Sequence, residues 1–228
     1  MNSMLRYMST LYLCSTLFAF VGFGLNIGSD SYSIAGDSES WNVDGGTNAV
    51  SLVRTDMESP VYLGGYIYLD FLPVVDIEAG FGFAGNSYDY TYTTPGIGGN
   101  ASETETYKLP WVRGNSYLTI QKPMFQIPMI KLYVGGGLNM SYSMPIVDKS
   151  FITSILSTDL DNSSGLDPNT IMEMTAESTG IHLEAGARFK PILIPFSINA
   201  KVRYNIVRDI IPDKSGFLTI TFGAGFAL

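Results

Sequence analysis

Apolar and polar side chains alternate with a period of two over long stretches of this sequence. The clearest stretch is Gly216 to Leu228, which reads GFLTITFGAGFAL and places large apolar side chains at every second position. This is the pattern of a β-strand with one apolar and one polar face. The apolar face is long enough to cross a bilayer as a tilted strand, which needs about 9–11 residues.

Seven further stretches repeat this alternation. With the last one, they predict strands at about 20–28, 61–71, 75–84, 111–121, 130–141, 181–189, 196–205 and 216–228. The connections alternate long, short, long, short, long, short and medium, and the first of them, 29–59, is polar throughout. Antiparallel barrels of the outer membrane have long outer loops and short periplasmic turns. The sequence therefore predicts an all-β fold, an eight-stranded antiparallel up-and-down transmembrane β-barrel.

Charge follows the same alternation. Every ionisable side chain in the expected strands lies on the face opposite the large aliphatic residues. Lipid exposure of the basic ones would cost roughly 2–4 kcal/mol each at the midplane, so we expect all of them inside a barrel that side chains just fill. This predicted polar network of the lumen consists of Asp70, Asp76, Glu78, Arg113, Lys131, His182, Glu184, Arg188, Lys201 and Arg203.

The end of the chain resembles the C-terminal strand of bacterial outer-membrane β-barrels. Their assembly signal reads polar, any, Gly, any, any, hydrophobic, any, hydrophobic, and Thr221, Gly223, Phe226 and Leu228 take those places. In topology, residues 20–228 are similar to the small family typified by the membrane domains of OmpA and OmpX. The resemblance implies a monomer in the bacterial outer membrane, surrounded by its lipid and recognised by the barrel assembly machinery.

A soluble barrel of the lipocalin type is the structural alternative. It would turn the aliphatic face inward as its core. It explains neither the terminal Gly-Phe pattern nor the rhythm of long and short connections.

The N-terminus predicts a secretory signal peptide over residues 1–19, followed by the barrel domain over 20–228. Arg6 is the only early charge, and an apolar core runs from Leu11 to Phe20. Beyond this segment no run of 18 apolar residues exists, which argues against helical membrane spans.

Composition narrows the functional classes. Charged residues make up 15%, while Gly, Phe and Tyr are abundant, as suits strands that face lipid on one side. One cysteine excludes a disulfide framework and a cysteine-based zinc site. The single His182 excludes most histidine-based metal sites, and we expect neither a metal nor a cofactor. A net charge of −8 argues against nucleic acid.

The expected outer loops hold 17 of the 21 acids and only five bases. Such a surface can attract divalent cations or cationic ligands, but the favoured explanation is a solvated face beside an anionic surface whose phosphates are bridged by metal. Asp159 and Asp161 begin an incomplete calcium loop, with Ser164 and Thr170 where Gly and Glu are needed. Asp167 and Pro168 predict the start of a short helix in the third outer loop.

Two further features bear on function. Tyr88, Tyr90 and Tyr92 predict a hairpin that protrudes beyond the membrane and turns near Pro95. His182 and Glu184 share a face, but by parity they point inward, away from lipid. We therefore expect no enzyme, and a structural or surface-interaction role through acidic outer loops. A narrow channel for small solutes is the alternative, and a lipid-modifying barrel enzyme is the third hypothesis.

Overall fold

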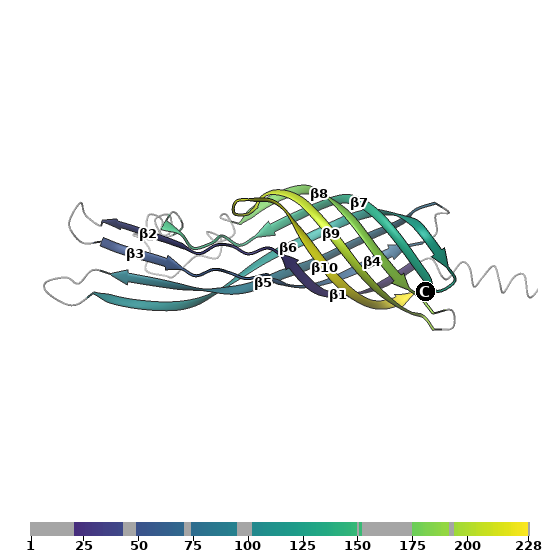
Figure 1. The fold of residues 1–228 in the computed structure, drawn as a ribbon, viewed down its shortest axis with the longest axis horizontal. Coiled ribbons are helices and arrows are strands. Elements are labelled where there is room, and N and C mark those ends of the chain that lie inside the picture. The colour runs from purple at the N-terminus through teal and green to yellow at the C-terminus, as the bar shows by residue number, and fades with distance from the viewer. Residues whose placement is uncertain are drawn as a thin grey trace, which may run out of the picture.

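The structure is a computed structural model that describes residues 21–42, 49–70, 74–94, 102–149, 151, 175–191 and 194–227. These segments form a closed antiparallel barrel from which a smaller sheet extends at one end (Figure 1). Within them, no helix has the length and apolar character needed to cross a membrane. The expected signal peptide, the third-loop helix and the calcium-like loop lie outside the described residues.

Eight strands pair in a ring. They are β1 (Val21–Ser31), β4 (Val61–Leu69), β5 (Asp76–Thr94), β6 (Glu103–Ile127), β7 (Ile130–Ser143), β8 (Ala176–Phe189), β9 (Phe196–Ile211) and β10 (Lys214–Ala227). All neighbours are antiparallel, and the ring closes because β1 pairs with β10 and β5 pairs with β6. At the first of these seams Phe23 lies opposite Phe226. The predicted fold class is confirmed.

A hairpin absent from the predicted strands lies in the first long connection. It consists of β2 (Asp37–Asn42) and β3 (Ala49–Arg54). β4 pairs with β5 up to Gly85, and farther out β3 takes that edge, from Tyr90 to Thr93. The 29–59 segment is therefore not a plain polar loop. Its Ser- and Asp-rich sequence contains two short strands, of which β2 pairs with β3 and β3 pairs with the outer part of β5.

Several strands are longer than the alternation predicted. β5 and β6 stay paired as far as Thr94 and Glu103, which confirms the protruding hairpin. At the opposite end β6 continues through a register shift between Pro123 and Phe125, so the turn expected over 122–128 is shorter. The connection expected over 207–215 is likewise a tight one, between Ile211 and Lys214.

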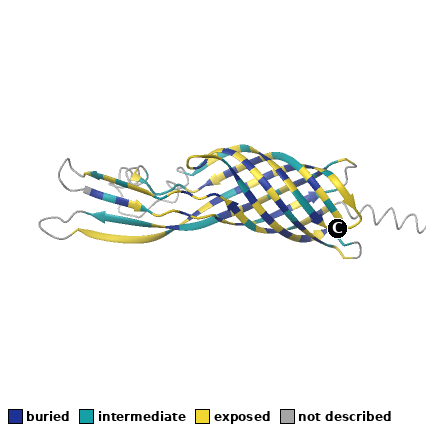
Figure 2. Ribbon diagram, viewed as in Figure 1, coloured by how far each residue is buried: buried dark blue, intermediate teal, exposed yellow. Residues whose placement is uncertain are grey.

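Inward-facing tyrosines lie against glycines of neighbouring strands. A Cβ on Gly82 would lie 2.2 Å from the Tyr62 hydroxyl oxygen, and one on Gly22 would lie 2.2 Å from the Tyr68 ring. No side chain other than hydrogen fits there while the ring stays in place. Buried and exposed residues alternate along the barrel strands, as side chains on a strand point to opposite faces in turn (Figure 2).

Candidate functional site

The interior of the barrel is a polar network. All ten residues that the sequence assigned to the lumen face inward, and eight of them are buried; Asp70 and Lys131 at one end keep side chains that are 13% exposed. Strand alternation alone positions them, because each follows its strand's inward face.

Glu78 on β5 is the centre of this network. It is fully buried. Its Oε1 forms an ion pair with Lys201 Nζ, and its Oε2 lies 3.3 Å from Arg188 Nη2. Tyr117 and Gln121 each donate a hydrogen bond of 3.0 Å to its carboxylate. A carboxylate with this many donors stays charged without water, since its neighbours replace the lost hydration.

Aromatic rings separate and cover the cations. The Arg203 guanidinium lies 3.4 Å from the centroid of Tyr117 and donates to Glu184 Oε2 through Nε at 2.9 Å. The Arg188 guanidinium lies 3.7 Å from the centroid of Tyr68. Such cation–π contacts gain strength when desolvated. They also fill the interior, so ion pairs and rings together leave the network tightly packed.

Two layers flank this centre. Toward the end with the short turns, Lys131 Nζ lies 2.7 Å from Asp76 and 3.5 Å from Asp70. Toward the other end, His182 Nε2 and Thr119 Oγ1 are 2.8 Å apart. His182 is only 1% exposed and points away from the lipid-facing surface.

Asp30 is a member of the network that the sequence analysis placed in the acidic outer loops. It is fully buried, 2.5 Å from Arg113 Nη2, and Thr219 donates to its second oxygen at 2.6 Å. β1 reaches Ser31 rather than ending at Gly28. Every second residue of this strand faces inward, so Asp30 lies on the same inward face as Gly22 and Asn26. Continuing the alternation by two residues would have found it. With Asp30, five carboxylates face five basic side chains in the described lumen.

The outer surface of the ring has the opposite chemistry. Large apolar side chains stand exposed on every barrel strand, among them Leu25, Ile67, Phe81, Leu138 and Phe222. Leu25, for example, is 74% exposed. No water-soluble barrel exposes large apolar side chains around its whole circumference. A closed ring leaves no unpaired strand edge, and a bilayer requires this. The soluble lipocalin alternative is therefore excluded.

The chain is similar to several solved structures, each at low sequence identity. No protein-family model matches the chain, and neither does any curated protein. Among solved structures, Neisserial surface protein A (NspA) is 10% identical with a TM-score of 0.49, and the match covers 92% of this chain and 97% of that one. The outer membrane protein OprG from Pseudomonas aeruginosa is 16% identical with a TM-score of 0.43, covering 92% and 98%. The N-terminal β-barrel domain of Pseudomonas aeruginosa OprF is 13% identical with a TM-score of 0.42, covering 90% and 96%.

The assignment itself rests on the closed ring, its polar interior and its apolar circumference. The chain has the fold of the small eight-stranded outer-membrane β-barrels. In this barrel the end with the long connections is the outer end, and the end with the short turns is the periplasmic end.

An apolar cluster of buried residues lies at the outer end of the barrel. We call it the plug; it consists of Tyr32, Ile34, Met57, Tyr88, Trp111, Val207, Ile210, Ile211 and Phe217, all buried. Phe217 joins it to the polar network, because the Arg113 guanidinium lies 4.5 Å from its ring centroid. Tyr32 packs edge-on against both Trp111 and Phe217. The sequence analysis missed the plug, since these residues come from four strands and two connections.

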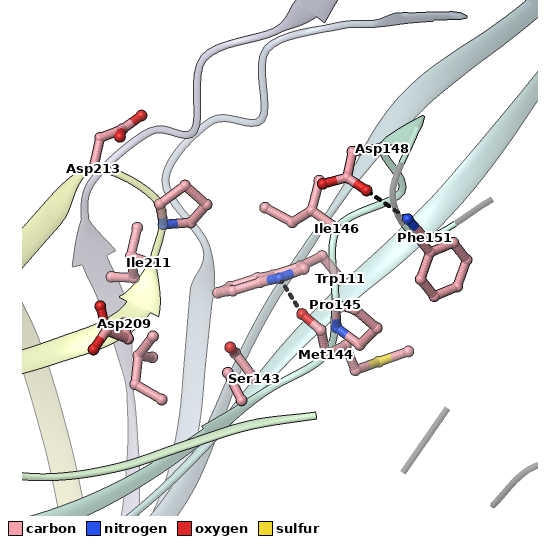
Figure 3. Close-up of a pocket in the computed structure, with 13 residues that line it drawn as sticks. Trp111, Ser143, Met144, Pro145, Ile146, Asp148, Phe151, Asp209, Ile211 and Asp213 are labelled. Atoms are coloured by element: carbon pink, nitrogen blue, oxygen red, sulfur yellow. Dashed lines mark hydrogen bonds between the residues drawn. The ribbon is translucent and has the colours of Figure 1, made fainter. Parts of the chain in front are cut away.

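The first part of the third outer connection is tied to the plug. Trp111 Nε1 donates to the Met144 carbonyl at 3.0 Å (Figure 3). The Val147 amide donates to the Tyr88 hydroxyl at 3.2 Å. Farther on, the Lys149 amide donates to Glu39 on β2. Burial raises the pKa of Tyr88 and of Tyr32 above the ordinary value. We call residues 144–149 the third-loop stem.

A pocket opens beside the plug at the outer end. It has a volume of about 670 Å3 and is lined by Trp111, by the third-loop stem and by the β9–β10 hairpin. Figure 3 shows Asp209, Ile211 and Asp213 of the hairpin across from Ile146 and Asp148 of the stem. Its size lies in the range typical of small-molecule sites. No group of three or more potential metal ligands gathers anywhere in the described part of the chain.

The predicted assembly signal lies on β10 as the alternation requires. Thr221 and Gly223 face the interior, while Phe226 is 53% exposed on the lipid-facing surface. Leu228, its last position, lies outside the described residues. Phe226 contacts Phe23 across the closing seam, with ring centroids 5.9 Å apart.

Proposed function

We propose that this protein is a monomeric, non-conducting barrel of the bacterial outer membrane whose acidic outer strands and loops make contacts at the cell surface. Residues 1–19 serve as its signal peptide. The barrel assembly machinery recognises Thr221, Gly223, Phe226 and Leu228. Outer-membrane lipid surrounds the apolar circumference, and a divalent cation or an extracellular ligand meets the acidic loops.

The buried apolar plug at the outer end is the observation that supports this proposal. A solute entering from outside meets the apolar plug first and the ion-paired lumen next. Moving a charge through the plug would strip its hydration without offering a partner. Below the plug, a passing ion would have to displace pairs such as Lys201 with Glu78. This arrangement supports a structural or surface-interaction role over the alternative of a narrow channel.

The same geometry supports a role without catalysis. A lipid-modifying barrel must bring its histidine to the acyl chains, whereas His182 is buried inside the lumen and bonded to Thr119. The network around Glu78 neutralises charge and fills space, and neither task needs a substrate.

Single-channel recording tests the proposal. The purified, heat-modifiable barrel is reconstituted into planar bilayers and recorded at both polarities beside bilayers that received detergent alone. We expect no sustained conductance steps. Reproducible steps from the folded protein would contradict a non-conducting barrel and support the channel.

A further inference from the structure

We propose that the pocket beside the plug binds an amphipathic organic cation, a small molecule that carries an apolar group next to an ammonium. This inference rests on the proposed function only for the exposure of the barrel's outer end to the cell surroundings. The chemistry of the ligand comes from the pocket lining itself.

The apolar half of the recognition comes from the walls. Trp111, Ile146, Phe151 and Ile211 line the pocket from β6, from the third outer connection and from the β9–β10 hairpin (Figure 3). Trp111 is held in place by its hydrogen bond to the Met144 carbonyl. A preformed apolar wall binds an apolar group without first ordering itself, which lowers the cost of binding. An aromatic or aliphatic group of moderate size suits this wall.

The polar half comes from carboxylates. Among the described residues that line the pocket, the ionisable ones are all acids, namely Asp148, Asp209 and Asp213. Asp148 accepts a hydrogen bond from the Phe151 amide at 2.7 Å. Arg208 and Lys214 adjoin the other two in sequence but do not line the pocket. A cation is therefore favoured over an anion, and a charged head beside an apolar wall selects an amphipathic cation over a metal ion.

The backbone of the hairpin fixes the two aspartates. Asp209 and Asp213 both have a φ of 59°, in the left-handed region that Asp and Asn tolerate better than other non-glycine residues. Asn is thus a conservative replacement at both positions, removing charge while keeping shape and turn. This makes the pair suitable for a test that leaves the fold intact.

Trp111 supplies the readout. The chain has two tryptophans, and Trp41 lies on β2, outside the pocket lining, so Trp41→Phe leaves Trp111 as the only reporter. Folded W41F protein in a zwitterionic detergent is titrated with 2-phenylethylammonium and, separately, with 2-phenylethanol, its uncharged counterpart. We expect a saturable change in Trp111 emission with the cation and a weaker response to the alcohol.

Charge removal completes the experiment. Asp209→Asn with Asp213→Asn should weaken cation binding about threefold to tenfold and leave the response to the alcohol unchanged. Glu58→Gln with Glu103→Gln removes equal charge from exposed positions away from the pocket and should change little.

Three results would overturn the inference: no saturable response to the cation, equal binding of cation and alcohol, or equal weakening by both charge pairs. None of these bears on conductance, so the inference and the proposed function fail independently.

Discussion

Each charged residue inside this barrel affects stability mainly by neutralising a partner of opposite charge. Asp30 and Arg113 show this most clearly, because both side chains are 0% exposed and lie 2.5 Å apart. A buried pair adds little net stability, but removing one partner leaves the other charge buried and uncompensated.

Asp30→Asn should therefore lower the free energy of unfolding by about 3–5 kcal/mol. Urea unfolding in detergent micelles, followed by tryptophan fluorescence, measures the change. The double variant Asp30→Asn with Arg113→Met removes both charges and should recover most of the loss. An equal loss in the single and double variants would show that charge pairing is not the cause.

Tyr88 predicts a pH dependence at the outer end. Burial raises its pKa above the ordinary value of about 10, so the folded state favours the protonated phenol. This contribution to stability is complete below pH about 10 and is lost as the pH rises through the raised pKa. We expect the third-loop stem to detach in alkali, since a buried phenolate is costly to keep out of water, and the hydrogen bond that the Val147 amide donates to Tyr88 offsets only part of that cost.

Emission from Trp111 in the W41F background measures that detachment. Tyr88→Phe should remove the alkaline transition attributed to this phenol, whereas Tyr92→Phe should preserve it. A transition that persists unchanged in Tyr88→Phe would assign it to another group.

The strands could be predicted from the sequence where they cross the membrane, because lipid outside and a filled lumen inside require apolar and polar side chains to alternate. Lipid outside and a filled lumen inside fix the face of every residue, so the eight barrel strands and the inward charges followed from alternation. Outside the bilayer that constraint ends. β2 and β3 carry no clear alternation, the outer end of β1 includes Asp30, and the plug joins residues distant in sequence. These features depend on tertiary pairing, which a single sequence does not display.

Gly82 on β5 and Tyr62 on the neighbouring β4 should be coupled in their effects on stability. Gly82→Ala places a methyl group against the Tyr62 ring and should cost about 1–3 kcal/mol through overpacking. Tyr62→Ala in the same molecule should relieve the part of this cost that comes from the ring and leave the part that comes from the Leu63 carbonyl oxygen, which lies 2.8 Å from the added carbon. A double-mutant cycle on urea midpoints measures the coupling, and additive effects would refute the contact.

Phe226→Ala should impair membrane insertion. Phe226 occupies a hydrophobic place of the predicted assembly signal and contacts Phe23 at the closing seam. Phe222→Ala is the matched control, since Phe222 is 60% exposed on the same strand and face but takes a place that the signal leaves unspecified. Heat-modifiable protein in outer-membrane fractions is measured for both. Similar levels of the two variants would argue against the assigned signal.

The whole molecule consists of two parts, a barrel inside the membrane and a smaller sheet outside it. Within the bilayer it is a closed barrel with a charge-balanced interior. Beyond it, β2, β3 and the outer halves of β5 and β6 form a sheet that extends past the plug (Figure 1). The plug belongs to both, because its residues come from barrel strands and from the first connection. Surface contacts can therefore vary in the outer sheet without disturbing the lumen.

The ion pairs of the lumen also bear on how the barrel assembles. Asp30 and Arg113 are 83 residues apart, and Glu78 and Lys201 are 123 apart. β5 and β9 face each other across the ring, so Glu78 and Lys201 meet only when the sheet has curled around completely. An open, half-inserted sheet would hold these charges unpaired beside lipid, at a cost of several kcal/mol per ion. Partly curled intermediates are thereby penalised, and insertion is expected to end in a single cooperative step as β10 reaches β1.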